Sequence, residues 1–133
     1  MTAAPAPATV LGWTATVPLP PRELSPNARR HWGTKRRVAI AYVTRCLVAL
    51  REQGIFPPRA PWPRVEIRLA FYVLRVADHD NRVASLKALL DGLVRAGYFA
   101  GDDPARLVFA AWPTQTLAPK ERCRLELTVT ALP

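Results

Sequence analysis

Five aspartates gather in one short stretch of this chain. All of them lie between positions 78 and 103, whereas the five glutamates are scattered over the rest of the sequence. The stretch has a net charge of −2 and the remainder has a net charge of +11. Such an arrangement suits phosphate chemistry, because basic residues can bind a phosphate backbone while carboxylates hold a divalent cation at one phosphate. The five are Asp78, Asp80, Asp91, Asp102 and Asp103.

The spacing of these aspartates predicts a shared ion. Asp78 and Asp80 directly follow the clearest predicted strand, and at the period of an extended chain their side chains project to the same side. Asp102 and Asp103 follow a predicted helix and precede another strand, so a chain that turns back can bring one of them to the same end of the sheet. The competing interpretation makes Asp78, Asp80 and Asp102 ordinary turn and helix-cap residues.

Lys87 and Asp91 stand four residues apart on the predicted helix. The simpler interpretation is an exposed ion pair, which contributes little to stability. The functional interpretation has Lys87 leaning toward the carboxylates, where it contacts the scissile phosphate or the leaving group. Asp80 and Lys87 are about two helical turns apart, so they share a face if the helix begins early.

The elements that must position these residues follow from periodicity. Ile40, Val43, Leu47 and Leu50 share one helical face, and alternating apolar residues mark two strands. We expect one domain over 13–133 with the order β-α-β-α-β-β, an α+β fold in which two helices pack on a small mixed sheet. An Ala/Pro/Thr-rich disordered tail is expected at 1–12. The predicted strands are 13–19, 64–74, 106–112 and 124–130, the helices are 35–53 and 83–96, and a polar loop fills 113–122.

Composition limits the class of partner. The 133 residues have a net charge of +9, nearly all of the excess being arginine, which points to a polyanion such as nucleic acid. Cys46 and Cys123 lack metal-ligand spacing and are expected to be free, buried thiols in a reducing cytoplasm. The first residues lack the pattern of a signal peptide, and no apolar run approaches the length of about 20 residues that a membrane-spanning helix needs.

A basic run precedes the first predicted helix. It packs five cationic residues into the nine positions 29–37, where their charge opposes the helix dipole unless an anion binds. Trp32 either stacks on an unpaired base or packs on the sheet, and His31 is expected to be a structural hydrogen-bonding residue. The residues expected to contact DNA are Asn27, Arg29, Arg30, Trp32, Lys35, Arg36, Arg37 and Lys120.

The motifs together resemble a known family. Asp78-His79-Asp80-Asn81, then Leu86-Lys87-Ala88-Leu89-Leu90-Asp91-Gly92-Leu93, and finally Asp102-Asp103 resemble the RusA-like Holliday junction resolvases, often encoded by phages and prophages. The opening segment Leu19-Pro20-Pro21 with Ser25-Pro26-Asn27 and the closing strand at 124–130 are similar as well. The similarity covers roughly 13–131.

The resemblance implies a function and a set of roles. Members are small homodimeric Mg²⁺-dependent endonucleases, for which Mn²⁺ is the alternative cation, and they nick four-way and related branched DNA in the bacterial host cell. Asp78, Asp80 and Asp103 match the catalytic, metal-binding carboxylates, with Asp102 beside them, and Lys87 matches the essential lysine. The common pattern has that lysine four residues after the second aspartate, whereas here it follows by seven. Asp91 is read as structural.

Two other classes of function remain open from the sequence. One is a branched-DNA binding protein without catalysis, which a displaced Lys87 or a lost metal site would produce. The other is an RNA-directed or less selective metal-dependent nuclease on the same fold.

Overall fold

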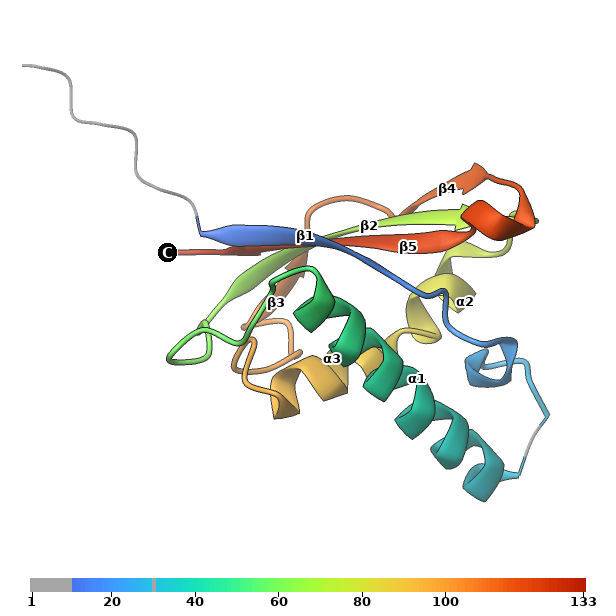
Figure 1. The fold of residues 1–133 in the computed structure, drawn as a ribbon, viewed down its shortest axis with the longest axis horizontal. Coiled ribbons are helices and arrows are strands. Elements are labelled where there is room, and N and C mark those ends of the chain that lie inside the picture. Colours follow the sequence, from blue (N-terminus) through green and yellow to red (C-terminus); the bar gives the residue numbers. More distant parts are fainter. Residues whose placement is uncertain (1–10, 30) are drawn as a thin grey trace, which may run out of the picture.

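One mixed sheet with helices on a single face forms the fold (Figure 1). The computed structural model describes residues 11–29 and 31–133, so nearly all of the predicted tail lies outside it. The strands run in the order β1-β5-β2-β3, and β4 also pairs with β2. The strands are β1 (Gly12–Val17), β2 (Val65–Val73), β3 (Leu107–Phe109), β4 (Thr114–Leu117) and β5 (Arg124–Ala131), and the α-helices are α1 (Trp32–Glu52), α2 (His79–Ala84) and α3 (Lys87–Arg95).

The strand β2 organises the sheet. It pairs antiparallel with β5 on one side and parallel with β3 and β4 on the other. Val65 is opposite Leu107 and Ala70 is opposite Thr114, so β3 and β4 follow one another along the same edge and together take the place of one strand. The predicted α+β class and the order β-α-β-α-β-β are therefore confirmed.

Alternating side chains of β2 and β5 build the core. Every second residue of each strand is buried against the helices, and residues between them face the other side, as a half-covered sheet requires. Each such aliphatic or aromatic side chain contributes about 1.5–3 kcal/mol when it is fully buried. The buried set from these strands is Val65, Ile67, Leu69, Phe71, Val73, Leu125, Leu127 and Val129.

The helix α1 begins earlier than predicted, and its buried stripe agrees with the predicted face only toward its end, at Leu47 and Leu50. Its fully buried residues are Tyr42, Cys46 and Leu50, spaced four apart, and the Tyr42 hydroxyl donates to the Pro18 carbonyl at 2.8 Å. Ile40, predicted to lie on the buried face, is 58% exposed. Figure 1 shows that the first half of α1 runs away from the sheet. Cys46 and Cys123 are both free, as predicted, but only Cys46 is buried, and the predicted burial of Cys123 was wrong because this residue is half-buried.

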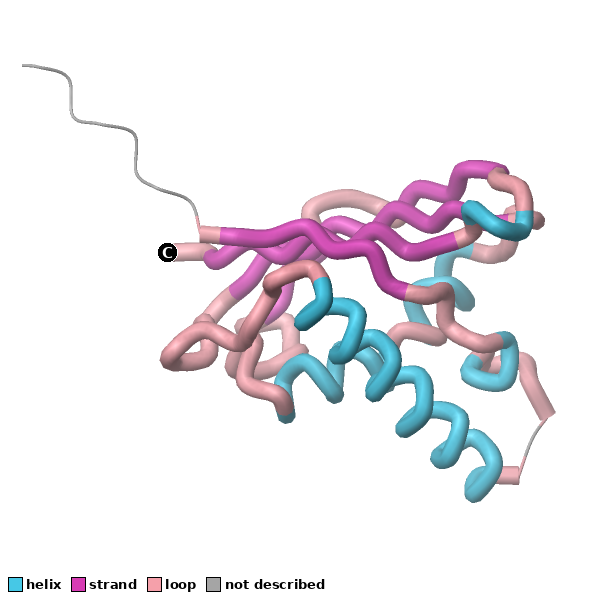
Figure 2. Tube along the Cα trace, viewed as in Figure 1, coloured by secondary structure: helices cyan, strands magenta, loops and turns pink. Residues whose placement is uncertain are grey.

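The second predicted helix is two helices. Six-residue α2 ends at Ala84 and α3 starts at Lys87, with a short turn between them (Figure 2). At the turn the Leu86 amide donates to the Val83 carbonyl, three residues back, instead of four. A single helix over 83–96 was therefore wrong, and so was the inference that Asp80 and Lys87 share one helical face.

The predicted polar loop at 113–122 contains a strand and a 3₁₀ turn. Thr114–Leu117 forms β4, and Lys120–Arg122 forms the turn η2. The preceding strand is shorter than predicted and covers only Leu107–Phe109. Sequence periodicity missed β4 because an exposed edge strand needs no apolar alternation, and none of its residues is fully buried.

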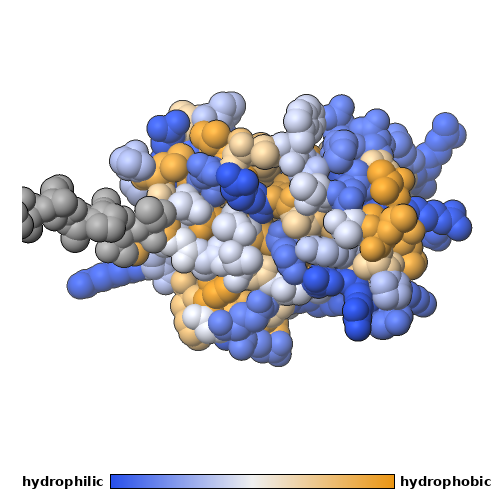
Figure 3. Space-filling model, turned by 90° about the horizontal axis from the view of Figure 1, so that it is seen from above, coloured by the Kyte–Doolittle hydropathy of each residue, from blue (hydrophilic) through white to orange (hydrophobic). Residues whose placement is uncertain are grey.

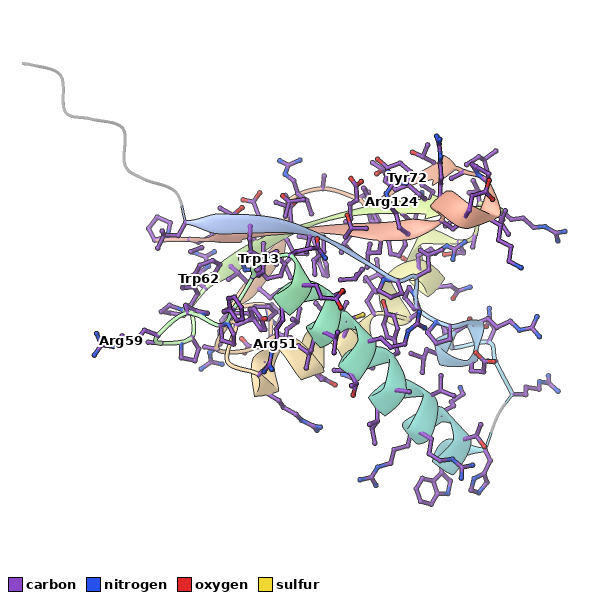
Figure 4. All side chains as sticks on the ribbon, in the orientation of Figure 1. Trp13, Arg51, Arg59, Trp62, Tyr72 and Arg124 are labelled. Carbon is purple, nitrogen blue, oxygen red and sulfur yellow. The ribbon has the colours of Figure 1, made fainter. Side chains whose placement is uncertain are left out.

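The other face of the sheet carries no helix. Figure 3 looks onto this side and shows a mostly hydrophilic to neutral surface, with smaller apolar areas toward both ends. Tyr72 and Arg124 lie on this face (Figure 4), and the Arg124 guanidinium carbon is 3.8 Å from the centre of the Tyr72 ring. Arg124 also pairs with Glu126 at 3.1 Å. The helical side of the sheet therefore carries the apolar core.

Candidate active site

The first two aspartates lie in a helix-capping turn, Asp78–Asp80, which we call the aspartate turn. Asp78 is the N-cap of α2, and its Oδ1 accepts a hydrogen bond from the Asp80 amide at 2.9 Å. Asp80 occupies the first turn of α2, where the helix dipole favours negative charge. The strand-like placement was wrong because β2 ends at Val73. The two side chains nevertheless share one turn, and both are exposed.

Two side chains that sequence reasoning missed hold the aspartate turn in place. Gln115 of β4 binds both polar groups of the Ala77 backbone: Oε1 accepts from the amide at 2.9 Å and Nε2 donates to the carbonyl at 2.7 Å. Arg82 of α2 donates to the same Oε1 at 3.2 Å and to the Arg75 carbonyl at 2.8 Å. The turn is therefore fastened to the sheet edge on both sides of Asp78.

Asp102 lies with Asp91 instead of with the aspartate turn. Burial raises the pKa of the Asp91 carboxyl, and a hydrogen bond with Asp102 raises it further, while the nearby Lys87 ammonium lowers it. These interactions place Lys87, Asp91 and Asp102 in one neighbourhood. Lys87 is exposed at the start of α3 and lies close enough to Asp91 to favour its charged form.

Asp103 is bound by Arg106 and by a backbone amide. Its Oδ2 accepts from Arg106 Nη1 at 2.6 Å, and its Oδ1 accepts from the Ala105 amide at 3.0 Å. The Arg106 hydrogen bond is the main reason that the pKa of the Asp103 carboxyl lies below its usual value. The Arg106 carbonyl in turn accepts from the Val65 amide, so Asp103 sits where β3 starts beside the beginning of β2.

The predicted carboxylates therefore divide into three groups. Over residues 11–29 and 31–133, no three His, Cys, Asp or Glu side chains lie close enough together to hold a metal ion. The full set of Asp78, Asp80, Asp102 and Asp103 is not assembled. Mg²⁺ commonly uses only one or two protein carboxylates together with waters and substrate phosphates, so the aspartate turn by itself has the chemistry for that ion.

The basic run lies at the start of α1. Lys35, Arg36 and Arg37 occupy its first turns, where no acidic residue is present. Ion pairs within the part of the chain that the structure describes involve Arg68, Arg106 and Arg124, and none involves this run. These cations are therefore available to an anionic partner.

Other residues of the run have distinct positions. His31 caps α1 by accepting from the Gly33 amide at 3.1 Å, which confirms its structural role. Trp32 is 71% exposed, so its packing on the sheet was wrong and the stacking alternative stays a prediction. Asn27 and Arg29 line an open cavity of about 470 Å³. Arg30 lies outside the described residues.

The aspartate turn and the basic residues share one end of the molecule. Figure 1 shows α2, the turn η1 (Arg22–Leu24), the start of α1 and η2 all at the end away from the C-terminus. Lys120 begins η2 and is exposed there. A polyanion bound at this end would therefore meet both the cations and the carboxylates.

Comparison with known proteins does not assign the chain to a family. No family model matches the chain, and no curated protein matches it. No helix in the described part of the chain has both the length and the apolar character needed to cross a membrane.

Proposed function

We propose that this protein is a divalent-cation-dependent endonuclease that acts on four-way and related branched DNA, similar to the RusA-like resolvases. The observation that carries the proposal is the aspartate turn, fixed by Gln115 and Arg82 at the same end of a basic chain as the Lys and Arg residues of α1. The motif resemblance and the α+β fold support the same assignment.

One set of residues would bind the DNA backbone, and another would act on a single phosphodiester bond. Arg29, Lys35, Arg36 and Arg37 would bind backbone phosphates, as basic side chains do in most DNA complexes. Asp78 and Asp80 would hold Mg²⁺, or Mn²⁺ in its place. A cation held there would supply polarisation of the phosphoryl oxygen and a hydroxide from water. Such an enzyme would act in the cytoplasm of a bacterial host cell.

The proposal includes a homodimer, because paired nicks on opposite strands of a four-way junction need two related sites. Within the single chain, Asp103 is bound to Arg106 and Asp102 lies beside Asp91, so neither joins the aspartate turn. We therefore assign the metal to Asp78 and Asp80 of the aspartate turn. The resemblance also implies roles in the active site for Asp103, Asp102 and Lys87.

A branched-DNA binding protein without catalysis is the second candidate. It is favoured by one observation, that the acidic residues of the described segments do not form a group of three. A third candidate is a nuclease with less selectivity for branched DNA.

One experiment separates these candidates. The protein is incubated with a synthetic four-way junction and Mg²⁺, beside Asp80→Asn and the control Glu52→Gln, which removes the same charge from an exposed site at the end of α1. We expect symmetric nicks from the unmodified protein and the control, and none from Asp80→Asn. Tight binding without nicks would identify the binding protein, and equal cutting of linear duplex would identify the less selective nuclease.

A further inference from the structure

An open cavity of about 560 Å³ borders the aspartate turn. This volume lies within the range of roughly 300–1,000 Å³ that is typical of small-ligand sites. Its walls are apolar except for one carboxylate. The helix α2 supplies Asp80, Val83 and Ala84, and the edge segment from β3 to β4 supplies Phe109, Trp112 and Pro113.

Two aromatic rings of this cavity are left open to solvent. Trp112 is 72% exposed and Phe109 is 40% exposed, so neither ring is used by the core. The Trp112 ring also lies 6.2 Å from the His79 ring at an angle of 48°, which places it beside the aspartate turn. Trp112 lines a second, smaller cavity with Arg68 and Thr128, so it stands between the aspartate turn and the open face of the sheet.

The walls limit what can occupy the cavity. A flat, apolar ring would stack on Trp112, and stacking of bases on aromatic side chains is a general mode of binding to unpaired strands. The Asp80 carboxylate must keep a hydrogen-bond donor or a cation when an occupant displaces its water. An aliphatic side chain offers neither, whereas the amino groups of nucleobases are donors to carboxylates.

We propose that this cavity binds one unpaired nucleobase of a DNA strand, stacked on Trp112. The inference rests on the proposed function and adds how the protein selects its substrate. A base in the cavity brings its own backbone phosphate next to the aspartate turn, because Asp80 is part of the cavity wall. A fully paired duplex offers no free base, so it would bind through the basic residues of α1 alone.

The test compares two DNA probes under metal-free conditions, which keeps binding separate from cleavage. One is a duplex with a single unpaired 2-aminopurine, and the other is the same duplex fully paired. The variant is Trp112→Ala, with Phe56→Ala as control, since Phe56 is 62% exposed and belongs to the connector after α1. Trp112→Phe keeps an aromatic ring and checks for a general loss of structure.

We expect Trp112→Ala to lower affinity for the unpaired probe by about 5- to 150-fold, the loss of one stacked base. Affinity for the paired duplex should stay within twofold, and stacking should quench 2-aminopurine only when an aromatic ring is present at position 112. Phe56→Ala should match the unmodified protein, and Trp112→Phe should keep most of the affinity.

Three results for Trp112→Ala would overturn the inference. They are an equal loss of affinity for both probes, no loss of affinity for either probe, and a change from dimer to monomer, which would make the cavity a protein interface.

The proposed function fails by a different result. If the protein nicks no junction but Trp112→Ala loses affinity for the unpaired probe, the cavity assignment holds without the proposed function. If nicking persists and Trp112→Ala has no effect on binding, only the cavity assignment fails.

Discussion

Asp91 and Asp103 show how differently two aspartates of one short stretch are held. Burial and the Asp102 hydrogen bond raise the pKa of Asp91, whereas the Arg106 hydrogen bond lowers the pKa of Asp103. The effects on stability have opposite signs. The raised pKa of Asp91 gives stability that is present in acid and is lost as the pH rises through the folded-state value. The lowered pKa of Asp103 gives stability that is present above its unfolded value and is lost in acid.

The position of Lys87 can be tested through Asp91. Removing the ammonium in Lys87→Met should raise the pKa of Asp91, because Lys87 favours its charged form. Asp102→Asn should lower the same pKa, since it removes a neighbouring negative charge. NMR titration of the Asp91 carboxyl carbon measures both shifts. If the pKa of Asp91 is the same in Lys87→Met as in the unmodified protein, Lys87 does not lie near Asp91. A contact between Lys87 and the aspartate turn would then have to be considered again.

At the level of elements, Gln115 links β4 to the segment before α2. We expect Gln115→Ala to lower the free energy of unfolding by about 1–2 kcal/mol, since two hydrogen bonds to Ala77 are lost. The Ala77 amide should then exchange faster with solvent. If Gln115 positions the aspartate turn, the nicking rate at saturating DNA should fall while DNA affinity is kept.

The matched control for this change is Thr116→Ala, an exposed neighbour on the same strand. It should leave both the Ala77 exchange rate and the nicking rate unchanged. Gln115→Glu keeps the acceptor for the Ala77 amide and loses only the donor. Its effects on exchange and nicking should therefore lie between those of Thr116→Ala and Gln115→Ala. Equal effects of Thr116→Ala and Gln115→Ala would mean that β4 acts only as a strand.

The packing of α1 on α3 depends on Gly92. A Cβ atom at this position would overlap the Cγ1 atom of Val43. Alanine favours a helix by about 1 kcal/mol over glycine, but overpacking costs about 1–3 kcal/mol. We therefore expect Gly92→Ala to destabilise by up to about 2 kcal/mol, measured by urea unfolding. In a Val43→Ala background the same change should stabilise by about 1 kcal/mol, and an unchanged sign there would contradict the packing argument.

These elements also show where sequence reasoning succeeds. Strong alternation predicted β2 and β5 correctly, because burial on one face imposes a period of two. Edge strand β4 left no such pattern, and the turn at Leu86 breaks a helix whose apolar residues continue through it. Gln115 and Ala77 are 38 residues apart, so no local spacing could reveal their pairing. The pairing of Asp102 with Asp91 is a tertiary contact of the same kind.

Over the whole molecule, basic residues lie at both ends, so the proposed site predicts which of the two ends binds DNA. The start of α1, with its unpaired cations, lies at the end of the molecule that also carries α2. Arg59 lies at the opposite end, on the connector before β2 (Figure 4). If net charge alone drove binding, DNA would bind equally well at either end. The proposed site instead requires DNA to bind mainly at the end with the start of α1, which we call the α1 end.

Charge reversal at the two ends tests this direction. Arg36→Glu with Arg37→Glu should weaken binding to a four-way junction and reduce the slope of log affinity against log salt by about 2, because each lost phosphate contact removes about 0.9. Arg59→Glu with Arg64→Glu changes the net charge equally at two exposed positions. Arg59 lies at the other end (Figure 4), and the Arg64 carbonyl accepts from the Leu132 amide next to the C-terminus. That control should lower affinity much less and keep the slope. Fluorescence anisotropy across a salt titration measures both. Equal losses from the two pairs would mean that net charge alone drives binding and that the α1 end is not the DNA-binding surface.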